Sequence, residues 1–223
     1  MRPLNKPTTA PNYIDGSPYR EAKADLIQSL GEYCSYCERH INDKKALQVE
    51  HIQPKSLIPA LERVWDNFLL ACASCNIHKD TKNPITLGIR LPHTNNLMLD
   101  IEVDPDSSLI SANNPEGQAF IDLVRLSDVA GEPGEPLTAT PGDDRYQKRF
   151  ETAGIAQEML EEYEAGTTDW KNVLRVVETR GFFSLWYTIF QGHPEVIEKL
   201  ITHFEGTHPA AFDSTNNYSL IAI

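Results

Sequence analysis

Short apolar runs in the first half of the chain alternate with polar segments and predict a small strand–loop–strand–helix unit. Residues 47–52 alternate between apolar and polar side chains, which predicts a short strand that Pro54 ends. Residues 68–71 form a second apolar run of strand length. A helix is expected to begin at Asn76, because asparagine is a common helix N-cap.

The flanking segments show mainly helical periodicity. Residues 17–30 are amphipathic, with Ser17 and Pro18 as the expected start and Gly31 as the expected stop. Further helices are expected at 118–126, 145–165, 168–191 and 194–204, and a loose β-hairpin at 97–112. The apolar positions of 173–190 exceed a one-sided stripe, which favours a buried core helix. Residues 130–143 are rich in Gly and Pro and predict a linker or surface loop.

The composition is typical of a globular protein, with 40% hydrophobic and 23% charged residues among 223. No apolar run approaches the length of a membrane span. No hydrophobic stretch follows Met1, so a secretory signal is not supported. We therefore expect a cytoplasmic protein that does not contact a membrane.

Charge is divided unevenly along the chain. The whole sequence carries a formal net charge of −12, but residues 1–90 are net +2 and residues 91–223 are net −14. An acidic surface repels the phosphate backbone of nucleic acids, whereas a basic surface attracts it. Only the first part of the chain is therefore suited to contact nucleic acid.

All four cysteines lie in that first part, as the pairs Cys34/Cys37 and Cys72/Cys75. Two residues between two thiolates let both sulfur atoms bind one ion, and two such pairs complete the tetrahedral sulfur shell of a structural Zn²⁺ site. Four protein ligands leave no position for water, so this zinc is expected to be structural. The alternative is four unrelated buried thiols.

These elements together predict an α+β fold, in which a small zinc-pinned ββα unit is embedded in a mostly α-helical chain. We expect an N-terminal arm and helix over residues 1–31 and the zinc-containing unit over 32–90. An acidic, mainly helical region is expected over 91–223.

The residues between and after the cysteine pairs carry a motif. His51, Asn67 and Asn76 are separated by 15 and 8 intervening residues. The strings Glu-His-Ile-x-Pro-Lys-Ser and Trp-x-Asn-x-Leu-x-x-Cys-x-x-Cys-Asn-x-x-Lys surround them. This pattern resembles the HNH motif of the ββα-metal endonucleases, in its His-Asn-Asn form and its four-cysteine subgroup. The resemblance covers about residues 32–84 and implies an HNH module at 32–90.

The resemblance implies a role for each motif residue. Glu50 and Asn76 would hold a catalytic divalent ion, His51 would act as general base, and Asn67 would hold the intervening loop by hydrogen bonds. Oxygen ligands suit Mg²⁺ or Mn²⁺, and such an ion relieves the negative charge that builds up on a phosphate during hydrolysis. A histidine with an ordinary pKa near ~6.5 is largely neutral at cytosolic pH and can accept a proton from water. Successive strand residues point to opposite faces, so a bend or bulge is expected where Glu50 and His51 meet one site.

The sequence leaves a structural interpretation of these residues open. His51 could be a structural histidine, Glu50 a surface carboxylate and Asn76 only a helix N-cap.

Other polar residues near the motif are weaker candidates. Lys55, Lys79 and Lys82 are expected to bind substrate phosphates as point charges, with a solvated surface of mixed charge as the alternative. Asp80 lies one helical turn after the last motif residue and is a further candidate for the metal. His78 lies off that face and is expected to contact solvent or phosphate.

The layout of the whole chain suggests a biological setting. A compact HNH unit with an acidic, largely helical extension, together with the string Tyr-Cys-x-Tyr-Cys-Glu, resembles the stand-alone HNH nuclease subunits of Septu-type bacterial anti-phage systems. This resemblance implies an ATPase partner that docks on the acidic region and supplies affinity for DNA. The alternative is that the helical region only covers the HNH unit.

The sequence thus predicts a metal-dependent endonuclease that hydrolyses phosphodiester bonds in DNA, with structural Zn²⁺ and catalytic Mg²⁺ or Mn²⁺. The family usually leaves a 5′-phosphate and a 3′-hydroxyl. Two alternatives stay open: a non-catalytic zinc-binding assembly module, and an RNase of the same fold.

Overall fold

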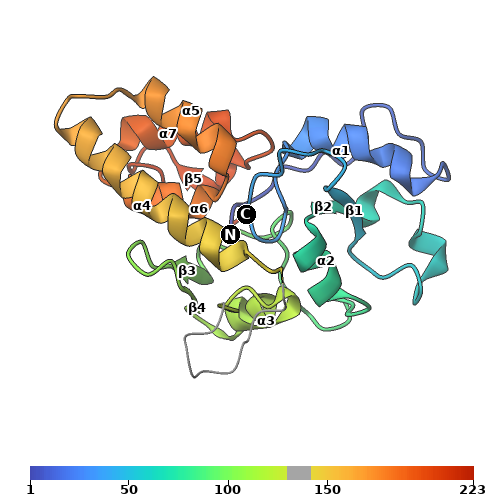
Figure 1. Ribbon diagram of the computed structural model, residues 1–223. Coiled ribbons are helices and arrows are strands. Elements are labelled where there is room, and N and C mark those ends of the chain that lie inside the picture. The colour runs from blue at the N-terminus through green and yellow to red at the C-terminus, as the bar shows by residue number, and fades with distance from the viewer. Residues whose placement is uncertain (130–141) are drawn as a thin grey trace.

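The computed structural model describes residues 1–129 and 142–223 (Figure 1). These residues form seven α-helices and three two-stranded antiparallel sheets, which confirms the predicted α+β class. The predicted linker at 130–143 falls almost entirely outside the described residues. Across the described residues, no helix combines the length and hydropathy needed to cross a bilayer.

The predicted ββα unit is present. Strand β1 (Gln48–His51) pairs with strand β2 (Phe68–Ala71) and helix α2 (Ala73–Lys79) follows directly. Both strands agree with the apolar runs in the sequence, but the expected helix start at Asn76 is wrong. The second cysteine pair itself occupies the first turn: Cys72 has extended backbone angles before the helix, and the Asn76 amide donates to the Cys72 carbonyl at 3.0 Å.

Helix α1 (Ala22–Leu30) covers this unit and follows a short 3₁₀ turn, η1 (Tyr19–Glu21). The expected start at Ser17 is therefore several residues too early, because the chain there is held in a turn by hydrogen bonds from the Ser17 amide to the Ile14 carbonyl and from the Gly16 amide to the Arg63 carbonyl. The predicted stop is correct. Gly31 has a φ of +76°, a conformation that favours glycine, and ends the helix.

The middle of the chain contributes a hairpin and a helix below the unit in Figure 1. Strands β3 (Ile101–Val103) and β4 (Ile110–Ala112) form the predicted hairpin with shorter strands. Helix α3 (Pro115–Val124) begins earlier than expected, because Asn114 caps it by accepting a hydrogen bond from the Gly117 amide at 2.8 Å.

The C-terminal part consists of helices α4 (Arg145–Glu164), α5 (Trp170–Arg180), α6 (Phe183–Ile189) and α7 (Pro194–His203), followed by the small hairpin β5 (Phe212–Asp213) and β6 (Ser219–Leu220). Expected helices at 145–165 and 194–204 are confirmed, whereas the single helix expected at 168–191 is wrong. Gly181 breaks it, with a φ of +77°.

The break at Gly181 has a tertiary cause. A Cβ at this position would lie 2.4 Å from both the Glu38 carbonyl oxygen and the His40 amide nitrogen, so only glycine fits against the first cysteine loop. The next amide, that of Phe182, donates to the Glu38 carbonyl at 2.9 Å. Helix α5 therefore ends where the C-terminal region packs against the first cysteine loop.

Two groups of buried apolar residues form the core. One joins α1, the β1–β2 sheet, the β3–β4 hairpin and α3, with Leu26, Phe68 and Phe120 among its members. The other lies mainly among α4–α7 and includes Val177 and Trp186. The first group crosses the predicted boundaries at 31/32 and 90/91, so these regions are packed together. The domain limits themselves stay a prediction.

Candidate active site

The four cysteines converge on one point, as their spacing predicted. Their sulfur atoms all lie within 4.8 Å of one another and all four side chains are buried. A Zn–S distance of ~2.3 Å in a tetrahedron corresponds to an S–S separation of ~3.8 Å, and the sulfur atoms of Cys37 and Cys72 are 3.8 Å apart. Burial raises the pKa of the thiols of Cys37 and Cys75 well above the ordinary range. A Zn²⁺ ion supplies the positive charge that makes such buried thiolates stable.

A buried arginine from the C-terminal region closes this cluster. Nη1 of Arg145, the first residue of α4, lies 3.3 Å from Sγ of Cys75 and donates to the Val124 carbonyl at 2.7 Å. Its Nη2 lies 2.7 Å from Asp143, which also lies 3.2 Å from Nε2 of His78. The expectation that His78 contacts solvent or phosphate is therefore wrong: the ring is buried against Asp143.

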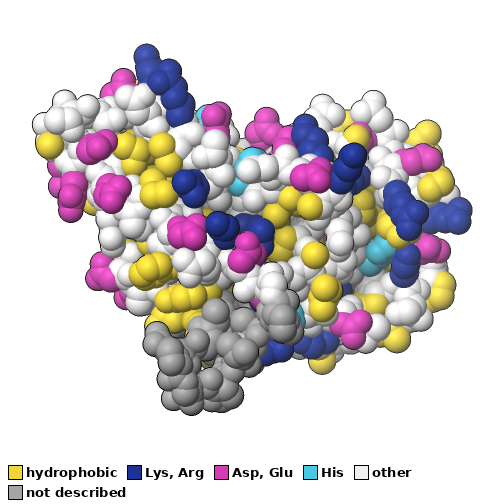
Figure 2. Space-filling model, viewed as in Figure 1, with side chains coloured by type: hydrophobic (Ala, Val, Ile, Leu, Met, Phe, Trp, Pro, Cys, Tyr) yellow, Lys and Arg dark blue, Asp and Glu magenta, His cyan; other side chains and the backbone are white. Residues whose placement is uncertain are grey.

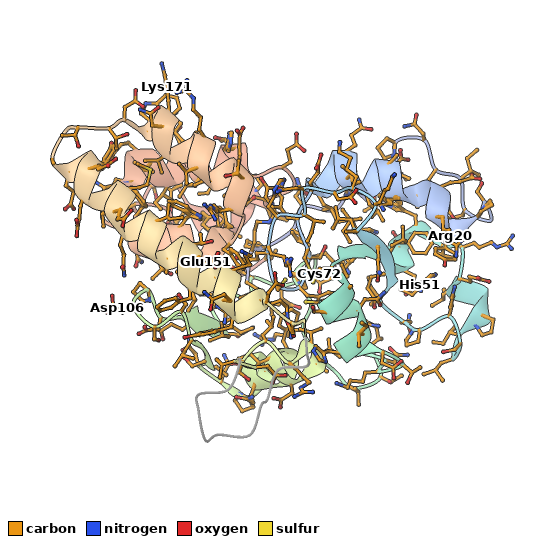
Figure 3. The ribbon with its side chains drawn as sticks, in the orientation of Figure 1. Arg20, His51, Cys72, Asp106, Glu151 and Lys171 are labelled. Atoms are coloured by element: carbon orange, nitrogen blue, oxygen red, sulfur yellow. The ribbon has the colours of Figure 1, made fainter. Side chains whose placement is uncertain are left out.

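A recess of about 330 Å³ lies beside the end of β1 and the helix α2. Glu50, His51 and Asn76 of the predicted active site contribute to its wall, whereas Asn67 does not. Figure 3 shows His51 near the end of the molecule opposite the C-terminal helices. The remaining lining residues come from η1, from the loop after β1 and from the end of α2: Tyr19, Val49, Pro54, Lys55, Ser56, Ile77, Asp80 and Thr81.

The ring of His51 is held in one orientation. Its Nε2 lies 2.9 Å from the carbonyl oxygen of Glu62. A carbonyl can only accept, so Nε2 carries the hydrogen and Nδ1 keeps a free lone pair. Tyr19 and Phe68 flank the ring at centroid distances of 4.8 and 5.2 Å. Burial lowers the pKa of His51, which favours the neutral imidazole that a general base requires.

Glu50 is the buried neighbour of this histidine and is paired with a lysine. Its Oε1 lies 2.7 Å from Nζ of Lys79, and Nζ also donates to the His51 carbonyl at 2.8 Å. Burial raises the pKa of the Glu50 carboxyl, and the positive charge of Lys79 opposes that rise. Lys79 is almost completely buried. The ammonium of Lys79 is already bonded inside the ββα unit, so this position does not suit the contact with a substrate phosphate that the sequence predicted.

Of the bend or bulge expected where Glu50 and His51 meet one site, the bulge is absent, and the chain bends directly after the strand, at Ile52 and Gln53. The strand register is regular from Gln48↔Ala71 through His51↔Phe68. The two side chains still line one recess, because His51 is the last residue of β1 and the loop carbonyl of Glu62 holds its ring at the strand end.

The two asparagines of the motif have different environments. The side-chain nitrogen Nδ2 of Asn76 donates to Oε1 of Gln48 at 2.5 Å, and the side-chain oxygen Oδ1 accepts no hydrogen bond from the described residues. That oxygen therefore remains available as a ligand. Asn67 is buried and bonds to the loop that follows β1: it accepts from the Gln53 amide at 2.8 Å and donates to the carbonyls of Gln53 and Leu61 at 2.9 and 3.2 Å.

The other two lysines also differ from each other. Lys55 is exposed at the recess, with Nζ 4.2 Å from the centroid of the Tyr19 ring and 3.8 Å from Glu62. Lys82 does not line the recess, and its Nζ lies 3.1 Å from the Leu123 carbonyl at the end of α3. Lys55 is thus the lysine of the three whose position is compatible with contact to a substrate phosphate in the recess.

Sequence reasoning missed several residues that shape these sites. Tyr19 lies against both His51 and Lys55, Gln48 orients the Asn76 amide, and Arg145 reaches the cysteine cluster. Gln48 lies two residues before Glu50 in β1 and therefore on the same face of the strand, a pattern that was visible in the sequence. Tyr19 and Arg145 come from segments that only the tertiary structure brings close.

Comparison with known proteins supports this geometry. Residues 34–82, which contain all four cysteines and the whole motif, match the family model for HNH endonuclease. The predicted resemblance to that family is therefore confirmed for this segment. A stretch of 79 residues is also 35% identical to the Septu protein PtuB of Bacillus thuringiensis. This match covers 33% of the chain and only 30% of that relative's length.

The donor set of the recess fits a hard divalent ion. One carboxylate and one amide oxygen are oxygen ligands of the kind that Mg²⁺ and Mn²⁺ take, and two protein ligands leave positions for water and phosphate oxygens. Glu50 has one oxygen engaged by Lys79, and Asn76 has its carbonyl oxygen free of described partners. The recess thus combines two oxygen donors with an oriented imidazole.

Proposed function

We propose that the chain is a metal-dependent endonuclease that hydrolyses phosphodiester bonds in DNA. The observation that carries this proposal is the orientation of His51: its Nε2 is bonded to the Glu62 carbonyl, which leaves the lone pair on Nδ1, and the residue lines the same recess as the oxygen donors Glu50 and Asn76. A zinc-binding assembly module has no need of a buried, oriented imidazole beside a buried carboxylate.

The chemistry follows from these groups. Nδ1 of His51 accepts a proton from a water molecule while the water oxygen bonds to phosphorus. The bond from phosphorus to the leaving ester oxygen breaks, and that oxygen takes up a proton from solvent. When bound by Glu50 and Asn76, a Mg²⁺ or Mn²⁺ ion supplies positive charge beside the reacting phosphate. Asn67 acts on this step only through the loop that carries Glu62, so it is a positioning residue.

Plasmid nicking by full-length protein tests the proposal. His51→Ala is expected to lower the rate by about 10²- to 10⁴-fold, the usual contribution of a general base. His193→Ala serves as the matched control, because His193 lies at the start of α7, paired with Glu164 and outside the recess. Both variants should keep the fold and the zinc content of the wild type. Undiminished nicking by His51→Ala would remove this residue from the mechanism.

The same nicking assay tests the metal requirement and the choice between DNA and RNA. Nicking is expected with Mg²⁺ or Mn²⁺ and not with excess EDTA, and Glu50→Gln or Asn76→Ala should raise the metal concentration needed for half-maximal rate. A matched RNA substrate distinguishes a DNase from an RNase of the same fold. Product ends of 5′-phosphate and 3′-hydroxyl are expected.

A role in defence against phage is proposed from the relative. The match to the Septu protein PtuB spans only about a third of either chain, so a defence role and a partner protein are proposals for the whole chain. We propose that an ATPase docks on the acidic C-terminal region, where residues 91–223 carry a net charge of −14. Such a partner would supply DNA affinity that this region's own charge opposes.

Size-exclusion chromatography with the product of a neighbouring ATPase gene tests the docking. Co-elution at micromolar concentration is expected, and it should weaken as salt rises because acidic side chains contribute. Independent elution of the two proteins would contradict the proposed partner.

A further inference from the structure

The candidate active site opens onto a longer depression. The recess at His51 shares Tyr19 and Asn76 with a second hollow of about 440 Å³. That hollow shares Arg20 and Lys23 with a third hollow of about 460 Å³. Because neighbouring hollows share wall residues, the three lie next to one another from the end of β1 along η1 and α1, and we refer to them together as one depression.

The walls of this depression are basic. The middle hollow is lined by Arg20 and Lys23 and by no carboxylate of the described residues. The third hollow adds Lys44 and Lys45 and contains one acidic residue, Glu21. We refer to the four cations Arg20, Lys23, Lys44 and Lys45 as the α1 basic track. Their concentration is notable in a chain whose net charge is −12.

Most of these charges are not neutralised within the chain. Arg20 is exposed, and in the described part of the chain it forms no ion pair with a carboxylate. Within residues 1–129 and 142–223, Nζ of Lys23 bonds only to the backbone carbonyl of Lys45, at 3.3 Å, which ties α1 to the loop before β1. Lys44 is paired with Glu32 at 2.7 Å. Most of the positive charge of the track is therefore available to bind a negatively charged ligand.

The track and the recess lie on the same part of the molecule. Figure 3 places Arg20 and His51 close together at one end, with Lys171 and Glu151 on the C-terminal helices. Figure 2 shows dark blue Lys and Arg side chains gathered at that end, and several magenta acidic side chains over the helices at the opposite end. A polyanion that reached His51 would therefore find attraction on the α1 side.

We propose that the α1 basic track binds the phosphodiester backbone of nucleic acid on one side of the phosphate held in the recess. The inference rests on the proposed function for the position of that phosphate. Lysine and arginine contacts to phosphate carry no base information, so the track contributes affinity and register but no sequence preference. Each neutralised phosphate releases counterions and adds to the salt dependence of binding.

Binding of labelled duplex DNA by full-length protein tests the track, in the His51→Ala background so that cleavage does not interfere. In the track variant Arg20→Gln/Lys45→Gln, two phosphate contacts are lost. The slope of log K against log salt should fall in magnitude by about 1.8, and the dissociation constant should rise about tenfold or more at low salt. The control Lys171→Gln/Arg175→Gln removes the same charge from α5, away from the recess, and should leave both quantities unchanged.

The outcomes separate this inference from the proposed function. Equal losses in the track and control variants would show a net-charge effect and overturn the inference, as would unchanged binding in both. Single-stranded DNA and duplex RNA of the same sequence show which nucleic acid the track prefers. Cleavage that persists in His51→Ala sinks the proposed mechanism, and binding is then compared without added Mg²⁺ or Mn²⁺ so that the DNA stays intact. Unchanged zinc content and unfolding midpoints ensure that a loss of binding is not a loss of fold.

Discussion

Lys79 and Glu50 form a buried ion pair in the wall of the candidate active site. Nζ of Lys79 lies 2.7 Å from Oε1 of Glu50, and the two side chains are 1% and 5% exposed. The same ammonium donates to the carbonyl of His51. One lysine at the end of α2 thus fixes both the proposed metal ligand and the backbone of the proposed general base.

The stability of this pair gives a first prediction. Lys79→Met leaves the Glu50 carboxylate buried without a partner and should cost about 3–5 kcal/mol of unfolding free energy. The double variant Glu50→Gln/Lys79→Met removes both charges and should be more stable than the sum of the single effects predicts, by at least about 1 kcal/mol. Urea unfolding measures all three variants. Strictly additive losses of unfolding free energy would show that the two side chains do not interact. Lys55→Met, at an exposed position, serves as the control.

A second prediction concerns the loop that carries Glu62. Asn67→Ala removes hydrogen bonds to Gln53 and Leu61 and lets this loop shift, so the His51 ring loses its fixed orientation. A small misplacement of a catalytic group can cost about 10²-fold in rate. We expect kcat for nicking to fall by about tenfold to a hundredfold, with KM and the metal requirement unchanged.

Asn67→Asp provides the matching variant. Its carboxylate can still accept from the Gln53 amide but cannot donate to the two carbonyls, so it should also fail to restore the rate. Full activity in either variant would show that the loop is held by other contacts. Asn42→Ala, at an exposed position before β1, should have wild-type kcat.

A third prediction links zinc retention to the C-terminal region. Arg145 donates a hydrogen bond to Cys75 and would offset the net negative charge of four thiolates around a bound Zn²⁺. Arg145→Met should release zinc to a colorimetric chelator about 10- to 100-fold more readily. Arg175→Met, on the exposed face of α5, should release zinc at the wild-type rate. Cys72→Ser should go further and unfold the ββα unit, because zinc binding contributes folding energy.

A fourth prediction concerns stability at acid pH. Burial, reinforced by the charge of Lys6, lowers the pKa of His93 from 6.5 to about 4, and its Nδ1 has no hydrogen-bond partner. The unfolded chain therefore binds a proton at this site between pH 6.5 and about 4 that the folded chain does not. Stability from this group is present above pH 6.5 and is lost as the pH falls, by about 2 kcal/mol at pH 5.

His93→Gln isolates this effect from other titrating groups. The difference in unfolding free energy between wild type and variant should change by that amount between pH 7.5 and 5, in favour of the variant at the lower pH. Zinc content should be measured at each pH, since loss of the metal would also destabilise the fold. A difference that does not vary with pH would mean that His93 has an ordinary pKa in the folded chain.

The sequence by itself determined the parts of this protein that depend on short-range spacing. The cysteine pairs predicted a common sulfur cluster, and the apolar runs at 47–52 and 68–71 predicted β1 and β2. His51, Asn67 and Asn76 predicted the HNH segment that the family comparison confirms. These signals are reliable because ligand spacing and strand alternation are properties of the local chain.

Only the tertiary structure decided which distant groups meet. It buried Lys79 against Glu50 and brought Arg145 to Cys75, which lies 70 residues away in the sequence. It also ended a helix at Gly181, where the first cysteine loop packs against the chain. It also placed Arg20 of η1 beside the recess. Hydrophobic periodicity indicates which face of an element is buried but not what packs against it, so the partner of a charged side chain follows only from long-range packing.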